Sequence, residues 1–251
     1  MKKILIQWVK KIGQQMGFEI HRKSTRRTMA QVLEHVASLG FQPKTVIDIG
    51  VARGTPALYA AFPHAYHFLI EPLKEFEEDL KRICSLYQGS YVLSAVGKKE
   101  DRMTINVHAD PSASSLFSEA DGKLVDGTPR EIPVETVDRL FAQHQLHGPI
   151  VLKIDVQGAE IDVLAGAIQT LEQTELVLLE VSFFQFYESG PQFYDVLVTM
   201  KNHGFVAYDF FGGHNRPFDG ALAQIDVVFV KEFGVFRKEH FYATEKQRGL
   251  L

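Results

Sequence analysis

The stretch TVIDIGVARGTPALYAAF, residues 45–62, decides the fold because it joins a predicted strand to a predicted helix through a glycine-containing loop. The apolar run over 45–49 predicts a buried strand, and a proline follows where the first helical turn is expected. Asp48 lies near the end of the strand, and Gly50 and Gly54 flank the turn. Because glycine lets backbone N–H groups approach a ligand closely, the stretch predicts a binding loop.

The rest of the chain alternates short apolar runs with amphipathic runs of helical spacing. This alternation predicts a mostly parallel sheet with helices on both faces. The other main strands are expected at 66–70, 90–96, 149–155, 175–184, 205–211 and 224–230, with an added strand at 103–109. No helix-length pattern separates the last two main strands, so we expect an antiparallel hairpin. The prediction is an α/β fold: one domain over 41–251 with a doubly wound, seven-stranded sheet, preceded by an N-terminal helical extension over 1–40.

The composition is that of an ordinary globular protein, with 45% hydrophobic and 23% charged residues. The single cysteine, Cys84, excludes an internal disulfide and a cysteine-based metal cluster, and it favours a reducing, cytoplasmic location. No apolar run reaches the roughly 18 residues that span a bilayer. We also expect no secretory signal, because the N-terminal apolar run is interrupted by polar residues.

Charge is distributed unevenly along the chain. Residues 1–27 hold eight Lys or Arg and one acid, a charge of +7, so the net charge of −4 leaves −11 for the remainder. The acidic remainder argues against nucleic acid as a partner, since phosphate binding requires a basic surface. The basic segment also has an apolar helical face, which allows two interpretations: contact with an anionic membrane, or packing on the domain or on a second subunit of a homodimer.

Ligands of such sheets bind beyond the carboxyl ends of the strands, where the strand order reverses. The loop has the spacing G-x-x-x-G, with Ala52 in the middle, instead of the G-x-G-x-x-G that binds a dinucleotide pyrophosphate. This favours a ligand without phosphate, such as S-adenosylmethionine, whose amino group Asp48 would attract. Glu71, at the end of the second strand, would bind both hydroxyls of a ribose. Ser94 and Ala95 fall where an adenine edge would lie.

The stretch LKIDVQGAEIDVLAGA, residues 152–167, begins as a buried strand that ends at Asp155. Asp155 would point into the same crevice, where it could contact the cofactor and serve as a general base; the alternative is a helix cap. Lys153 lies inside the buried strand and therefore requires a partner, which the sequence does not identify. Glu160 falls in the first turn of the next helix, where the helix dipole favours a carboxylate.

The predicted loop 210–222 supplies a second candidate base and two groups that could bind acceptor hydroxyls. His214 could act as the base near neutral pH. The hydroxyl-binding groups would be Arg216 and Asp219. The alternative is an ordinary hairpin loop with solvated polar groups. Asp155, Asp226 and His214 could together form an oxygen-rich Mg²⁺ site, but nothing in their spacing requires one, so no metal site is predicted.

Aromatic residues follow the strand at 175–184. Phe184 and Tyr187 could form a wall for a sugar or a polyketide ring. The alternative is that these side chains belong to the core or to a dimer contact.

Five segments in order resemble the FkbM family of S-adenosylmethionine-dependent methyltransferases: VIDIGVARG, FLIEP, SSL, IPVETVDRL and LKIDVQGAEIDVLAGA. The resemblance covers about residues 43–231. It implies the class I methyltransferase fold, a Rossmann-like seven-stranded sheet whose last strand is antiparallel. It also implies methyl transfer to a hydroxyl of a sugar, a glycan or a natural product. The loop carboxylate Asp48 and both loop glycines would then hold the methionine part, and Glu71 the ribose. Many relatives have Asn where this chain has Ala52.

Two other functions stay open at this point. A nicotinamide-dependent oxidoreductase would use the same fold, but the loop lacks the central glycine. A non-catalytic binding module on this fold is the second alternative, although it would have no need of the loop glycines and the strand-end carboxylates. The acceptor, and the choice between O- and N-methylation, are not determined by the sequence.

Overall fold

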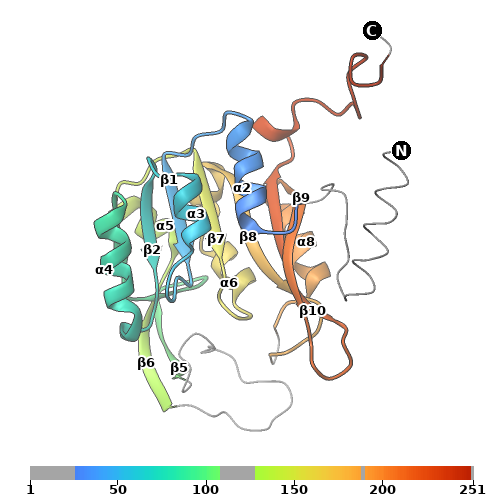
Figure 1. Cartoon of the computed structure of the whole chain (residues 1–251). Helices are drawn as coiled ribbons and strands as arrows, with labels where there is room; N and C mark the ends of the chain where they lie inside the picture. The colour runs from blue at the N-terminus through green and yellow to red at the C-terminus, as the bar shows by residue number, and fades with distance from the viewer. Residues whose placement is uncertain (1–25, 108–127, 188–189, 250–251) are drawn as a thin grey trace, which may run out of the picture.

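The computed structural model describes residues 26–107, 128–187 and 190–249. A seven-stranded sheet forms its centre (Figure 1). In spatial order its strands are β3 (Gly89–Val92), β2 (Tyr66–Ile70), β1 (Thr45–Ile49), β7 (Ile150–Ile154), β8 (Thr174–Ser182), β10 (Leu222–Lys231) and β9 (Phe205–Asn215). The strands from β3 to β8 are parallel, and β10 is antiparallel to both of its neighbours. The predicted fold class and the terminal hairpin are confirmed.

Strand order reverses between β1 and β7, because the chain builds β1, β2 and β3 in one direction and then returns to add β7 and β8 in the other. Every residue of β1 and of β7 is buried. That burial explains why both strands appear in the sequence as apolar runs. The carboxyl ends of β1 and β7 therefore lie side by side at the position where this class of sheet binds its ligands.

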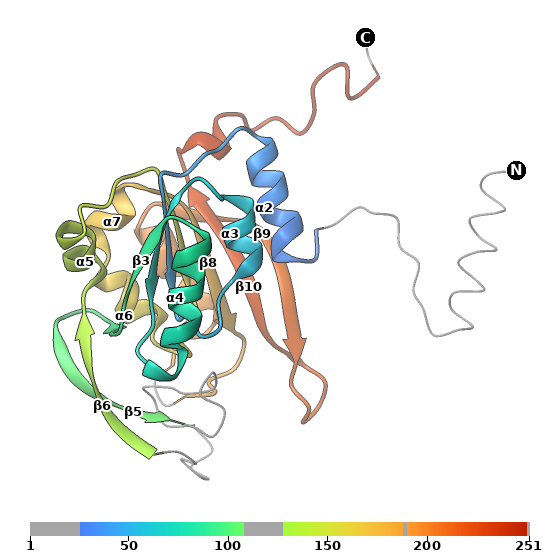
Figure 2. The same cartoon turned by 60° about the vertical axis from the view of Figure 1, so that its left-hand side comes forward.

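Helices cover both faces of the sheet, as Figure 2 shows. One face carries α2 (Met29–Ser38), α3 (Pro56–Ala61) and α4 (Glu77–Leu86). The other carries α5 (Val137–Gln143), α6 (Glu160–Ala165), α7 (Ile168–Glu172) and α8 (Phe193–Asn202). Short 3₁₀ helices occur at Lys74–Phe76 and Val235–Arg237. No helix in the described part of the chain is long and apolar enough to cross a membrane.

A second, smaller sheet lies below the main sheet in the view of Figure 1, where β5 and β6 are labelled. Its strands, in spatial order, are β4 (Ala95–Val96), β6 (Thr128–Glu135) and β5 (Asp101–Val107). The segment 90–96, expected to form one strand, is divided between the two sheets, since β3 pairs with β2 and β4 pairs with β6. The added strand expected at 103–109 is β5, which begins at residue 101; residues 108–109 lie outside the described residues.

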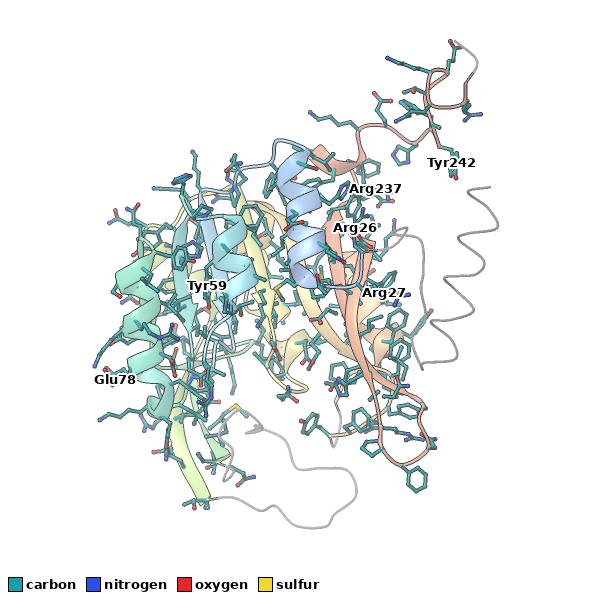
Figure 3. The ribbon with its side chains drawn as sticks, in the orientation of Figure 1. Arg26, Arg27, Tyr59, Glu78, Arg237 and Tyr242 are labelled. Atoms are coloured by element: carbon teal, nitrogen blue, oxygen red, sulfur yellow. The ribbon has the colours of Figure 1, made fainter. Side chains whose placement is uncertain are left out.

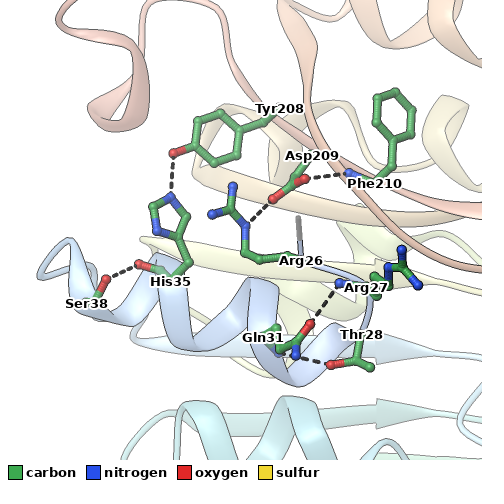
Figure 4. Close-up of polar contacts among 9 residues, drawn as sticks. All are labelled: Arg26, Arg27, Thr28, Gln31, His35, Ser38, Tyr208, Asp209 and Phe210. Atoms are coloured by element: carbon green, nitrogen blue, oxygen red, sulfur yellow. Dashed lines mark hydrogen bonds and ion pairs between the residues drawn. The ribbon is translucent and has the colours of Figure 1, made fainter. Parts of the chain in front are cut away.

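Helix α2 comes from the predicted N-terminal extension and packs into the core of the domain. Val32, Leu33 and Val36 are fully buried on this helix. Figure 4 shows the polar contacts around it: Arg26 Nε donates to Asp209 Oδ2 at 2.5 Å, and the His35 ring meets the Tyr208 hydroxyl at 3.2 Å. The first described residues are therefore held against β9 by these hydrogen bonds. The basic segment 1–27, except for its last two residues, lies outside the described residues.

Candidate active site

The loop between β1 and α3 is shaped by residues in the left-handed backbone region. Gly50 has φ +74°, and a Cβ at this position would overlap the carbonyl oxygen of Asp155. Gly54 has φ +109°, and its Cβ would stand 2.8 Å from the Ile83 side chain. Glycine at position 50 therefore allows the ends of β1 and β7 to meet. The middle residue, Ala52, also has a positive φ, of 45°, which is uncommon for a residue with a side chain.

Glu71 fixes this loop from the end of β2. Its Oε2 accepts a hydrogen bond from the Ala52 N–H and its Oε1 from the Leu73 N–H, both at 2.9 Å. The side chain is nearly buried, and burial raises the pKa of Glu71 above its usual value even though the two N–H groups act against it. Each carboxylate oxygen has a second lone pair, so Glu71 can hold the loop and still accept hydrogen bonds from a ligand.

Lys153 has two carboxylate partners. Its Nζ lies 3.3 Å from Asp48 Oδ1 and 3.3 Å from Asp155 Oδ2. Asp48 stands beside it on β1 in the strand register and also accepts a 2.6 Å hydrogen bond from the hydroxyl of Tyr59, which is labelled in Figure 3. Burial alone would lower the pKa of Lys153, but attraction by Asp48 and Asp155 outweighs it and raises that pKa. The lysine is therefore held as a cation between two strand ends.

A cavity of about 500 Å³ opens along the carboxyl edge of the sheet. Its lining comes from the glycine loop, from Glu71 after β2, from Ser94 and Ala95 after β3, and from Lys153 and Asp155 at the end of β7. Two further carboxylates line it, Glu180 on β8 and Asp226 on β10. We call Asp155, Glu180 and Asp226 the acidic wall. One end of the cavity is thus formed by the glycine loop after β1 and by Glu71 after β2. The other end is formed by the acidic wall of β7, β8 and β10.

The family model for the methyltransferase FkbM domain matches residues 48–207. That range includes the glycine loop, Glu71 and Asp155, and it covers more than half of the chain. The chain belongs to the FkbM family of S-adenosylmethionine-dependent methyltransferases. The resemblance found in the sequence is confirmed, and methyl transfer is favoured over the oxidoreductase and the binding module.

Similar solved structures are distant. Fibrillarin of Aeropyrum pernix with bound S-adenosyl-L-methionine shares 14% identity at a TM-score of 0.42, over 74% of this chain and 66% of that one. Magnesium protoporphyrin IX methyltransferase of Synechocystis shares 12% at 0.42, over 92% and 96%. An rRNA methylase of Streptococcus thermophilus shares 10% at 0.44, over 83% and 98%. Likenesses this distant do not indicate an acceptor. No curated protein matches the chain.

The cavity suits the family's cofactor. The Ser94 hydroxyl is buried and has no hydrogen-bond partner within the described residues, although the residue lines the cavity. An adenine or ribose edge would satisfy it, because buried polar atoms are normally paired. Asp48 is fully buried and is not among the lining residues. In this structure Asp48 contacts Lys153 and Tyr59, and its attraction for the amino group of the cofactor stays a prediction.

Other sequence candidates lie away from the cavity lining. His214 belongs to β9, where it stands opposite Gln224, because both strands of the hairpin are longer than expected and only 216–221 form the loop. Arg216 binds Asp219 through two hydrogen bonds of 2.7 and 2.6 Å, and its guanidinium lies 3.8 Å from the centre of the Phe184 ring. Tyr187 reaches the site indirectly, since its hydroxyl donates to Gln157, a lining residue, at 2.8 Å.

The sequence pattern does not indicate Glu180 as a site residue, and it indicates Asp226 only as a possible metal ligand. The available signal was a carboxylate inside each of two apolar strands. Burial and the neighbouring carboxylate Asp155 raise the pKa of Glu180 to about 8 and that of Asp226 to about 6. Burial also raises the pKa of Glu160 to about 7. Within the described residues no cluster of three or more His, Cys, Asp or Glu is arranged to hold a metal.

Proposed function

We propose that this protein transfers a methyl group from S-adenosylmethionine to a hydroxyl oxygen of a sugar, a glycan or a polar natural product. The observation that supports this most is the acidic wall in the same cavity as the glycine loop. A hydroxyl is a weak nucleophile, and its attack requires a general base close to the reacting oxygen. Carboxylates in the wall could supply that base and could also accept hydrogen bonds from neighbouring hydroxyls.

In this proposal the loop after β1 and the carboxylate after β2 bind the cofactor. The carboxylates of β7, β8 and β10 act on the acceptor hydroxyl. S-adenosylmethionine supplies the methyl group and a leaving group that departs as a neutral thioether. The loop from Gly50 to Gly54 lies against the methionine part, and Glu71 accepts hydrogen bonds from the ribose. Asp155 orients the acceptor hydroxyl in line with the transferred methyl, about 3 Å from it, and is the base predicted from the sequence.

The charge of the wall limits the acceptor. Three carboxylates line this end of the cavity, and Lys153 beside them is already paired with two aspartates. A phosphate placed among them would be repelled, so we propose a neutral or amine-bearing acceptor in place of a nucleic acid. Phe184, Tyr187, Arg216, Asp219 and His214 would contact only the distal part of a long acceptor.

Cellular context stays a proposal. A cytoplasmic location fits the single free cysteine, Cys84. Contact of residues 1–27 with a membrane or a second subunit, and a homodimer built on that contact, are proposed from the sequence alone.

A methyl-transfer screen tests the proposed function. Labelled S-adenosylmethionine is offered with neutral glycans, amino sugars, sugar nucleotides and polyketide-type alcohols, and mass spectrometry locates the new methyl group. We expect methoxy products from neutral or amine-bearing acceptors. Asp155→Asn should bind the cofactor and lose most of its turnover, and Glu172→Gln, which removes an exposed carboxylate outside the cavity lining, serves as the control. Tight NADH binding without S-adenosylmethionine binding, or methylation at nitrogen alone, would contradict the proposal.

A further inference from the structure

Glu180 and Asp226 form a carboxylate pair across two strands. They stand directly opposite each other in the antiparallel ladder of β8 and β10. Opposed residues of such a ladder project to the same face, with Cβ atoms about 4.5–5.5 Å apart. Both side chains line the cavity. The pair is therefore a feature of strand register, fixed by the sheet and not by a loop.

Hydrogen bonding leaves this pair open to a ligand. Glu180 Oε2 accepts from Gln224 Nε2 at 2.9 Å and from Gln157 Nε2 at 3.4 Å, and no described residue donates to its Oε1. Asp226 receives no hydrogen bond from the described residues. A Cβ on Gly212 would stand 2.6 Å from Asp226 Oδ2, so the glycine makes room for this carboxylate. Both side chains are half-buried and line the cavity, from which a donor can reach them.

Neighbouring charges favour a proton on the pair. Asp155 on β7 and Glu160 on α6 add negative charge near Glu180, and Lys153 is the cation that opposes them while paired with Asp48 and Asp155. After burial, repulsion from the carboxylates is what raises the pKa of Glu180 to about 8. At neutral pH the pair therefore holds a proton in the ligand-free protein, and a positive charge entering the cavity would displace it.

We propose that Glu180 is the general base of the methyl transfer, and that the positive sulfonium of bound S-adenosylmethionine expels its proton and so readies it to act. This inference rests on the proposed function, since it requires that cofactor and a hydroxyl acceptor. Glu180 Oε1 takes the acceptor proton as the oxygen–methyl bond forms. The methyl–sulfur bond breaks and its electron pair stays on sulfur. The proton then stays on Glu180, because the positive charge is gone, and passes to water when the next S-adenosylmethionine binds.

Asp226 and Asp155 have supporting roles in this scheme. Asp226 is a positioning residue that keeps the proton affinity of Glu180 high until the cofactor binds. Asp155, ion-paired with Lys153, orients the acceptor hydroxyl. The base is thus charged only when a methyl donor is present, and it is neutral again after the donor has been used.

Calorimetry of the whole 251-residue chain measures the expelled proton directly. S-adenosylmethionine and S-adenosylhomocysteine are titrated at pH 7 in two buffers that differ in ionisation enthalpy, which gives the number of protons released by each. The two ligands share the same amino and carboxyl groups, so their difference reports the sulfonium charge. We expect about one proton more for S-adenosylmethionine, and no difference at pH 9.5, where Glu180 has already lost its proton.

Variants assign the proton to the pair. Glu180→Gln should remove the difference between the two ligands and lower turnover about 100-fold or more, while its affinity for S-adenosylhomocysteine stays within a few-fold. Asp226→Asn should reduce the released proton and shift the acid limb of the pH–rate profile to lower pH. Glu172→Gln removes the same negative charge at an exposed position. It is the matched control and should behave as the wild type.

The outcomes separate the two proposals. Failure to bind S-adenosylmethionine would overturn the proposed function and this inference with it. Binding and methyl transfer with equal proton release for both ligands would overturn the inference alone, as would full turnover in Glu180→Gln. If that variant does not fold, the wild-type titrations and Asp226→Asn still decide the question.

Discussion

Replacing Lys153 by methionine is expected to destabilise the protein strongly. Methionine has nearly the same length and apolar volume as the lysine stem, so the change removes the charge while packing is largely kept. Lys153 is 7% exposed, and its two partners Asp48 and Asp155 lie at the ends of neighbouring strands. After the change, Asp48 would be fully buried with the Tyr59 hydroxyl as its remaining donor among the described residues.

The size of the effect follows from burial. Removing one partner of a buried ion pair costs about 3–5 kcal/mol, because the other charge is left without compensation. Almost all of this arises at Asp48, since the Asp155 side chain is 36% exposed and water can solvate it. For a domain of this size the same loss lowers Tm by roughly 6–20 °C.

Urea unfolding followed by far-ultraviolet circular dichroism at pH 7.5 measures the loss. The double variant Lys153→Met/Asp48→Asn should recover a large part of it, because the unpaired charge is then gone. Lys201→Met is the control, since Lys201 is 56% exposed and pairs with Glu232 at the surface, where such pairs contribute about 0–1 kcal/mol. A loss of under 1 kcal/mol in Lys153→Met, or a double variant no more stable than the single one, would refute the reasoning.

Three further changes test the site. Gly50→Ala should prevent soluble folding or abolish cofactor binding, checked by thermal unfolding and calorimetry, because its Cβ would overlap the Asp155 carbonyl. Glu71→Ala should weaken S-adenosylhomocysteine binding, measured by calorimetry, since two loop N–H groups lose their acceptor; unchanged affinity would remove Glu71 from the site. Glu160→Gln tests pH dependence: the pKa of Glu160 is raised to about 7, so its contribution to stability is present below about pH 4.5 and is lost as pH rises to about 7. Urea unfolding should show the variant gaining roughly 2–3 kcal/mol over the wild type between pH 5 and pH 8.

The sequence predicts those candidate residues whose positions are set by one strand and not by the order of the strands in the sheet. Asp48, Glu71 and Asp155 can be selected from the sequence because each lies at or near the end of an apolar run, and the ends of parallel strands meet at one edge. The candidate residues on the cofactor side of the cavity can therefore largely be predicted from short sequence patterns. The same holds for Lys153, whose need for a partner follows from burial, although the identity of Asp48 as that partner required the register between β1 and β7.

Residues that depend on strand order were missed. β10 comes after β9 in the chain, yet it lies between β8 and β9 in the sheet, and this order alone brings Asp226 opposite Glu180. His214 was selected because the hairpin loop was expected to be long. The ladder instead continues to Asn215 and keeps His214 out of the cavity lining. No local pattern contains either fact, because hydrophobic periodicity reports which face is buried and not which strand is the neighbour.

The charges of the site differ between the cofactor end of the cavity and the acceptor end. Lys153 is shared by Asp48 and Asp155, so the part of the edge beneath the glycine loop is nearly neutral before any ligand binds. Glu180 and Asp226 have no cation of their own among the described residues and are left with an excess of negative charge. A cofactor with a positive sulfonium would compensate that excess only while it carries the methyl group, and its product would not. The register of β8 and β10 therefore gives the acceptor end of the cavity a charge state that depends on whether the donor is spent.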